Sequence, residues 1–293
     1  MILEPENVAR FYRVWHALLT FVNRETGLVK DWPERFEQGV RVEQAVRLRD
    51  ALWADDALLS RFLAVNPAGL SDVDLALVRS WEHRVEVKFA ILYRQLQKYA
   101  VVMTETGGGN PRAYAVLGLA GSPGELVPET PLPVDIVLLP FEGRIVFDSI
   151  LKTPGVFLGP GIRRRLGAEY RDIQDGRGLI AALPPDPGAI RAGIEKGNTR
   201  LLKAFRAHLA GSGLSEKMIA QHTDAVAALG AEMLADTEPR PLLELDLPTA
   251  QPWIANHPAS ATSLKRFARF LYETERGDPE RCTRLQEIRR RSG

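Results

Sequence analysis

The sequence VDIVLLPFEGRIVF at residues 134–147 carries the clearest strand pattern of the chain. Its two apolar, β-branched runs, residues 134–139 and 144–147, are bounded by Gly and Pro, a pattern typical of a β-hairpin. Similar runs precede it at residues 99–104 and 112–119. We therefore predict an antiparallel sheet or a small barrel in this part of the chain.

Helices are predicted on the N-terminal side of these strands. Apolar residues recur every three or four positions across residues 8–22, and the same period predicts helices over residues 42–53 and 57–65. A serine and an aspartate with capping-box spacing open a further helix, predicted over residues 72–85. Residues 89–93 fit the end of that helix or the start of a strand, and we favour a strand.

Proline and glycine mark a boundary between two domains. The segment PPDPG at residues 184–188 is the strongest break in the chain, and 293 residues are enough for two domains. We expect an α+β domain over residues 1–183, with helices packed around a small antiparallel sheet. A helix predicted over residues 161–173 falls within it. A Pro/Gly-rich linker over residues 184–197 and an all-α helical bundle over residues 198–293 are expected to follow.

Composition limits the class of protein. The 45% apolar and 26% charged residues are ordinary for a soluble globular protein and exclude disorder, collagen and coiled coil. The formal charge is only +1, so a nucleic-acid surface would have to be local. Cys282 is the only cysteine, which excludes an intrachain disulfide and favours a reducing compartment. The sequence contains neither a membrane-spanning apolar run nor a secretory leader, so we expect a cytoplasmic protein with no membrane partner.

Four segments of the second domain occur in a recognisable order. They are LKAFRAHL at residues 202–209, GLSEKMI at residues 213–219, Trp253-Ile254 on a helix started by proline, and SLKRFARFLY at residues 263–272. In this order they resemble the core-binding domain of phage integrases and other tyrosine recombinases. The resemblance covers residues 198–276, about a quarter of the chain, and implies a small SAM-like helical bundle that grips DNA.

The catalytic half of that family does not follow the resemblance. It would bring an arginine, a His-x-x-Arg motif and a tyrosine nucleophile, yet only 21 residues follow Tyr272. We therefore expect no recombination by this chain alone, and the resemblance implies a DNA-gripping or assembly role. The first domain resembles only uncharacterised bacterial proteins, which implies no function for it.

Positive charge concentrates near the C-terminal end. Residues 191–293 contain 16 Lys and Arg against 13 Asp and Glu, net +3, whereas residues 1–190 contain 22 against 24, net −2. In residues 262–293 the count is nine against five, net +4. On the helix predicted over residues 260–274, the basic residues fall roughly 100–200° around the axis from Leu264 and its apolar neighbours. The predicted DNA-binding residues are Lys265, Arg266 and Arg269, helped by Arg200, Lys203 and Arg206.

Two other functions stay open from the sequence. If the basic face is merely solvated, the bundle would dock a protein partner or a second copy of the chain. Glu86 and Lys88 have the Glu-x-Lys spacing of metal-dependent nucleases, which also need an upstream aspartate such as Asp72 or Asp74. The five histidines form no pair at helical ligand spacing. We therefore predict no catalytic residue, no metal site and no cofactor, and favour a non-enzymatic DNA-binding or DNA-associated protein.

Overall fold

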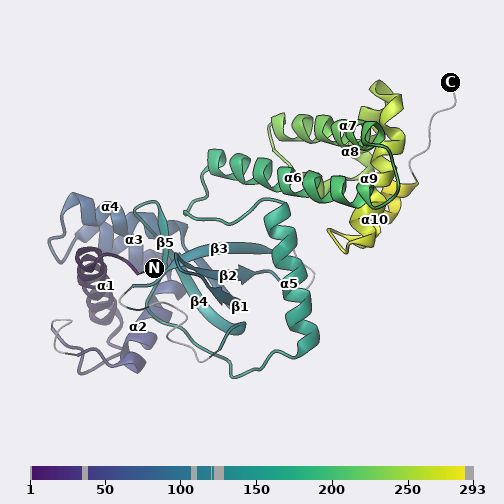
Figure 1. Cartoon of the computed structure of the whole chain (residues 1–293). Coiled ribbons are helices and arrows are strands. Elements are labelled where there is room, and N and C mark those ends of the chain that lie inside the picture. The colour runs from purple at the N-terminus through teal and green to yellow at the C-terminus, as the bar shows by residue number, and fades with distance from the viewer. Residues whose placement is uncertain (1, 35–38, 107–110, 120, 122–128, 288–293) are drawn as a thin grey trace. The chain divides into compact units, whose positions relative to one another are not determined.

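The computed structural model describes residues 2–34, 39–106, 111–119, 121 and 129–287, which form helices and a β-sheet (Figure 1). The chain divides into two compact units. The first comprises Met1–Thr104, Tyr114–Phe157 and Ala181–Pro184, and the second comprises Glu105–Ala113, Leu158–Ile180 and Pro185–Gly293. The second unit thus includes two segments that precede residue 183, so the division is not the single boundary expected from the Pro-rich stretch.

In its described part, the first unit contains α1 (Pro5–Thr26), α2 (Val42–Ala54), α3 (Asp56–Val65) and α4 (Asp72–Ser80). Local signals set the ends of these helices. Gly27 ends α1 with a φ of 64°, a left-handed conformation that glycine adopts without steric cost. The side chain of Ser71 caps α4 by accepting a hydrogen bond from the backbone N–H of Asp74.

Five described strands close into a small barrel. They are β1 (Val85–Gln95), β2 (Ala100–Thr104), β3 (Arg112–Leu117), β4 (Leu132–Phe141) and β5 (Arg144–Phe147), hydrogen-bonded in the order β1-β2-β3-β5-β4, with β4 returning to β1. The pairing of β3 with β5 is parallel, which corrects the expectation of a purely antiparallel sheet. Parallel neighbours need a long connection, and β4 lies between β3 and β5 in the sequence.

The start of β1 corrects the predicted length of the preceding helix. That helix was predicted to reach residue 85, but α4 ends at Ser80, a 3-10 turn spans Trp81–His83, and Val85 already pairs with β4. The β-branched side chains of Val85 and Val87 favour the strand. The strand expected over residues 89–93 is confirmed as part of β1.

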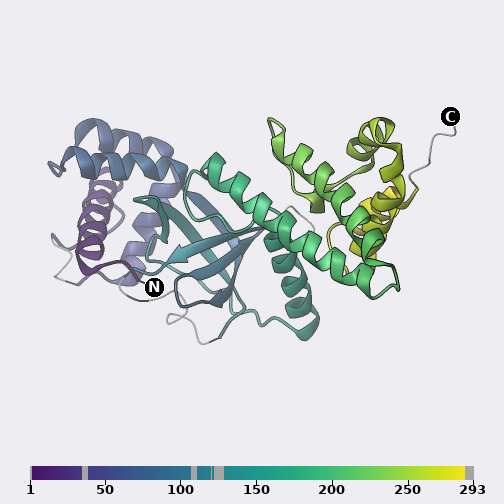
Figure 2. The same ribbon diagram turned by 45° about the horizontal axis from the view of Figure 1, so that its top comes forward.

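The β4–β5 hairpin is buried on both faces. Val137 and Leu139 belong to the same hydrophobic cluster as Trp15 of α1, and Figure 2 shows the helices beside the barrel. Ile136 and Leu138 alternate with them and are buried as well. Since successive strand residues point to opposite faces, Ile136 and Leu138 fill the barrel interior while their neighbours contact the helices.

The second unit is built mainly from helices, which confirms the helical C-terminal region. Its described helices are α5 (Pro160–Asp175), α6 (Pro187–Ala210), α7 (Glu216–Ala235), α8 (Leu247–Asn256), α9 (Ala261–Glu273) and α10 (Pro279–Gln286). Leu201, Phe205, Val226, Leu264 and Phe267 are central members of its core. Among all the described helices, none has both the length and the apolar character needed to cross a membrane.

Helix α6 begins at Pro187, inside the segment 184–197 that the sequence predicts as a linker. The side chain of Asp186 accepts a hydrogen bond from the backbone N–H of Ala189 at 2.7 Å, and proline suits the first position of a helix. The residues that resemble a chain break therefore start a helix.

Helix α5 belongs to the second unit, although the sequence places it before the boundary. A Cβ atom built on Gly197 would lie 2.3 Å from the carbonyl oxygen of Gly176, and one on Gly193 would lie 2.3 Å from that of Arg177. Both glycines of α6 therefore let the backbone that follows α5 pack directly against α6.

Candidate functional site

The predicted basic residues of α9 lie on the side of the helix away from its core. Leu264 and Phe267 are fully buried, whereas Lys265 and Arg269 are exposed. Arg269 Nε donates to Glu273 Oε1 at 2.6 Å. Lys265 has no hydrogen-bond or ion-pair partner within the residues that the structure describes. Its positive charge on the exposed side of α9 is therefore not neutralised by a carboxylate there.

Arg266 is half-buried and lies near α7. Burial and, to a smaller extent, the charge of Arg266 lower the pKa of His222, whose Nδ1 is 2.9 Å from Ser263 Oγ. The Nε atom of Arg266 is buried and has no hydrogen-bond partner in the described residues. Arg266 is therefore the least accessible of the three α9 cations.

The predicted residues of α6 are mostly paired with carboxylates. Arg206 Nη2 lies 2.9 Å from Glu216 Oε2, and Arg200 Nε lies 3.6 Å from Asp175 Oδ1. Lys203 is exposed and has no partner within the described part of the chain. Only Lys203 among these three therefore presents an unpaired charge.

The six predicted residues do not form one surface. Helices α6 and α9 meet through Phe205 and Phe267, whose ring centroids are 5.2 Å apart. At about 100° per residue, Lys203 lies roughly 160° around α6 from Phe205. By the same measure, Lys265 and Arg269 lie roughly 160° around α9 from Phe267. The basic sides of the two helices therefore point away from their shared contact, and the α9 residues form a separate set.

Sequence reasoning missed a buried ion cluster that uses Arg200. Asp175, at the end of α5, binds the guanidinium groups of Arg276 and Arg200. Burial raises the pKa of neighbouring Asp172, whose Oδ2 accepts a hydrogen bond from the backbone N–H of Gly277 at 3.0 Å. These contacts join α5 to the segment after α9, so Arg200 supports the packing of the second unit.

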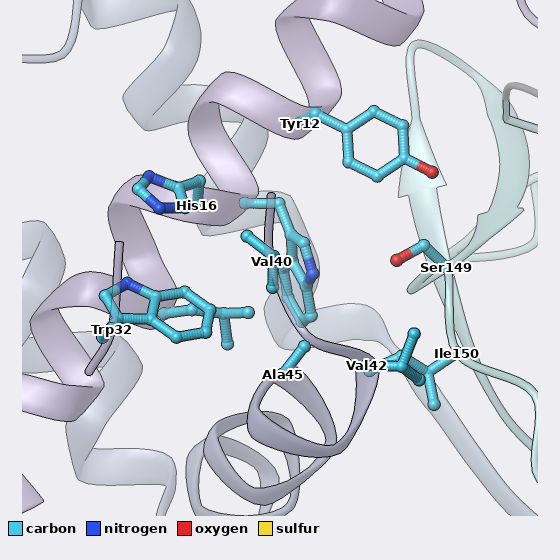
Figure 3. Close-up of a pocket in the computed structure, with 10 residues that line it drawn as sticks. Tyr12, His16, Trp32, Val40, Val42, Ala45, Ser149 and Ile150 are labelled. Carbon is cyan, nitrogen blue, oxygen red and sulfur yellow. The ribbon is translucent and has the colours of Figure 1, made fainter. Parts of the chain in front are cut away.

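The first unit contains a cavity of about 220 Å³ between α1, the start of α2 and the segment after β5 (Figure 3). Tyr12, Trp15, His16, Trp32, Ala45 and Ser149 are among the residues that line it. The apolar pattern of residues 8–22 predicts that Trp15 packs in the core. No local pattern indicates the cavity itself, because its walls come from segments far apart in the sequence.

Two stacked rings form one wall of the cavity. The imidazole of His16 and the indole of Trp32 have centroids 5.4 Å apart and an interplanar angle of 15°. His16 Nε2 lies 3.1 Å from the carbonyl oxygen of Pro33, so Nε2 is the donor, since a carbonyl oxygen only accepts. Trp32 Nε1 donates to Thr20 Oγ1 at 2.8 Å. Hydrogen bonds thus fix the orientation of both rings.

One polar pair lies at the edge of the cavity. The hydroxyl of Tyr12 is hydrogen-bonded to the side chain of Ser149, and Figure 3 shows their two oxygen atoms facing each other. Burial raises the pKa of Tyr12. The phenol therefore stays protonated at neutral pH and offers a hydroxyl beside the rings.

A buried ion pair supports the cavity wall. Asp148 is fully buried, with Oδ2 3.5 Å from Arg49 Nε, and it accepts hydrogen bonds from Trp53 Nε1 at 3.2 Å and the Ile150 backbone N–H at 3.3 Å. Burial raises the pKa of Asp148 to about 6, although Arg49 acts in the opposite direction. Trp53 stacks on Trp15 at 5.8 Å, and Ile150 and Trp15 both line the cavity. Asp148 therefore supports two walls of the cavity, one at Trp15 through Trp53 and one at Ile150 directly.

Two residues of the nuclease alternative, Glu86 and Asp74, are engaged in ion pairs. Glu86 Oε1 accepts a hydrogen bond from Arg84 Nε at 2.7 Å. Asp74 is paired with Arg10 and Arg13, each at 2.8 Å. Within the described ranges, no three His, Cys, Asp or Glu side chains gather as a metal site would require. These contacts give the nuclease alternative no support.

No family model matches the chain, and no curated protein or solved structure shows significant similarity to it.

Proposed function

We propose that the protein binds duplex DNA through the basic side of α9, without acting on the DNA chemically. The observation that carries this proposal is the exposure of Lys265 and Arg269 opposite the buried apolar side of α9. Lysine and arginine at such positions displace condensed counterions from phosphates, which supplies affinity that does not depend on base sequence. The resemblance of residues 198–276 to the SAM-like core-binding domain of tyrosine recombinases supports the same function.

The charge distribution favours contact near the C-terminal end. Residues 262–293 have nine Lys and Arg against five Asp and Glu, net +4, whereas residues 1–190 have a net charge of −2. Arg200 and Arg206 are already paired with carboxylates. We therefore assign the main contacts to α9 and a minor role to α6.

The expected binding is weak and depends on salt. Each phosphate contact contributes a slope of roughly −0.9 to the dependence of log K on log salt concentration. With Lys265, Arg266 and Arg269 all in contact, the slope would reach about −2.7. Arg269 is ion-paired with Glu273, and Arg266 is half-buried, so neither is fully available to a phosphate. We therefore expect a slope of log K against log salt concentration between about −1 and −3.

Fluorescence anisotropy of a labelled duplex, measured with the full chain at increasing salt, tests the proposal. The double variant Lys265→Glu/Arg269→Glu is expected to weaken binding at low salt by about tenfold or more and to reduce the slope by about 2. The matched control is Arg79→Glu/Lys98→Glu, which makes the same charge change at exposed positions of the first unit. It should leave the affinity within about twofold, since no phosphate contact is removed.

Two results would overturn the proposal: no anisotropy change with the wild-type chain at low salt, or an equal loss of affinity in the control variant. The protein-interaction alternative would instead give a dimer or larger species in light scattering that salt does not disperse. Incubating plasmid with the protein and Mg²⁺ separates binding from cleavage, because a non-enzymatic protein leaves the plasmid intact. A cut plasmid would favour the nuclease alternative.

A further inference from the structure

The cavity of the first unit has room for a small ring system. Its volume is about 220 Å³, and an engineered apolar cavity of about 150 Å³ is large enough to hold benzene. One six-membered ring with a substituent, or a fused bicyclic ring, therefore matches the available space. All of its described lining residues belong to the first unit.

The walls favour a flat ligand. Trp15 is held by stacking on Trp53 at 5.8 Å and by an edge contact with Trp81 at 5.7 Å. His16 and Trp32 stack on each other. Because these rings are fixed before binding, a flat ligand can stack on them without ordering them first. Each aromatic pair adds roughly two- to tenfold in affinity beyond simple burial.

The lining favours a neutral ligand. None of its described residues is Lys, Arg, Asp or Glu. The nearby charges of Arg49 and Asp148 are buried and face each other. A charged ligand would therefore lose its hydration without gaining a partner of opposite charge.

The hydroxyl pair adds one polar requirement. A hydroxyl oxygen has two acceptor positions and one donor, so the hydroxyl of Ser149, which is hydrogen-bonded to Tyr12, can accept a further hydrogen bond. Their oxygen atoms lie at the same side of the cavity in Figure 3. An O–H or N–H group on the edge of a ring is the matching donor.

We propose that this cavity binds a neutral, planar aromatic molecule that carries one O–H or N–H group, the chemistry of a phenol or an indole. The proposal does not depend on DNA binding, because every residue that supports it lies in the first unit. The first unit would then bind a small molecule, and the second unit would bind DNA.

Isothermal titration calorimetry of the full chain with phenol and with indole tests the proposal. Cyclohexanol is the first control ligand, since it has the hydroxyl and the ring size but is not flat, and it should bind at least about fivefold more weakly than phenol. Benzoate is flat but charged, and no binding is expected. The proposal is wrong if phenol and indole give neither heat nor a thermal shift at millimolar concentration, or if cyclohexanol binds as well as phenol.

Two variants and one control test whether phenol binds in the cavity. Ala45→Phe fills the cavity from α2, and Val42→Trp covers its edge from a position that is 65% exposed. Each should lower phenol affinity by about tenfold or more, because the ligand and the new ring need the same space. Ala54→Phe, at an exposed position of the same helix, is the matched control and should bind phenol as wild type does.

The polar pair has its own variant. Ser149→Ala should weaken phenol binding several-fold but leave toluene binding unchanged, since toluene has no donor for the hydroxyl pair. Near-ultraviolet circular dichroism checks that each variant keeps its aromatic packing. If correctly folded Ala45→Phe and Val42→Trp proteins bind phenol as tightly as wild type, the cavity is not the binding site.

Discussion

Replacing Asp148 with Asn is expected to remove a pH dependence of folding stability between about pH 4 and pH 6. Asp148 is fully buried, and its only nearby cation is Arg49, 3.5 Å away, among the described residues. Trp53 Nε1 and the backbone N–H of Ile150 donate to its two oxygens. Burial outweighs these contacts and raises the pKa from 3.8 to about 6.

The direction of the effect follows from proton binding. Between pH 3.8 and about 6, the folded state holds the proton of Asp148 while the unfolded state has released it. The free energy of unfolding contributed by this group is therefore greatest below pH 3.8 and is lost as the pH rises through about 6. A difference of about two pKa units corresponds to about 3 kcal/mol, an order-of-magnitude figure for this group.

Urea unfolding of wild type and Asp148→Asn at several pH values measures this loss. Asn keeps an oxygen that can accept a hydrogen bond from Trp53, but it does not titrate. The difference in free energy of unfolding between the two proteins should therefore change by about 3 kcal/mol between about pH 4 and pH 6. A difference that stays constant within about 1 kcal/mol would refute the reasoning. The control Asp50→Asn removes an exposed carboxylate 3.2 Å from the same Arg49 and should cost less than about 1 kcal/mol.

Two further predictions concern the second unit. Gly197→Ala should destabilise the chain to urea by about 1–3 kcal/mol, because the new Cβ would meet the backbone oxygens of Gly176 and Asp175 at 2.3 and 2.7 Å. Gly211→Ala, whose new Cβ would have its nearest neighbour 3.4 Å away, should be nearly neutral, and equal losses would contradict this account. The thiol of Cys282 is buried, and burial raises its pKa to about 11, so a thiol reagent should react with the folded chain far more slowly than with the unfolded chain. Equal rates in native buffer and in urea would show that the second unit opens freely.

The β4–β5 hairpin was predictable because its signals are local. Residues 134–139 and 144–147 are short apolar, β-branched runs on either side of a turn, and Phe141 pairs with Arg144 across that two-residue turn. Glu142 and Gly143 in that turn have φ values of 48° and 71°, which match the tight turns that suit hairpins. The parallel pairing of β3 with β5 is a contact between strands that are separated in the sequence by β4, and no local pattern encodes it.

The start of α6 shows where local signals conflict. Pro187 and Gly188 are typical of a chain break, yet Asp186 before them caps a helix. The packing of Gly197 against Gly176 decides that α5 joins the second unit, and this contact joins segments that are separate in the sequence. Glycine inside a helix usually destabilises it. The reason for glycine at position 197 is the close approach of the Gly176 backbone, which the sequence alone does not reveal.

The candidate sites also differ in whether they follow from local sequence or from tertiary contacts. The basic side of α9 follows from helical period alone, and the structure exposes Lys265 and Arg269 there. The pairing of Arg200 with Asp175 depends on a tertiary contact. The cavity depends on bringing Tyr12 of α1 to Ser149 after β5, and no sequence pattern links these two residues.

The pairing of the predicted cations decides how DNA binding would behave. Three of the six, Arg200, Arg206 and Arg269, have a carboxylate within 3.6 Å, so moving them onto phosphates would first break an ion pair. Lys203 lies on the side of α6 that faces away from α9, and Arg266 is half-buried, so Lys265 is the readiest contact on α9. One or two contacts per chain change affinity only modestly over a fourfold change in salt, because each contributes a slope of roughly −0.9. Tight binding at physiological salt would therefore require several chains side by side on the duplex, and a steep, cooperative binding curve would be its signature.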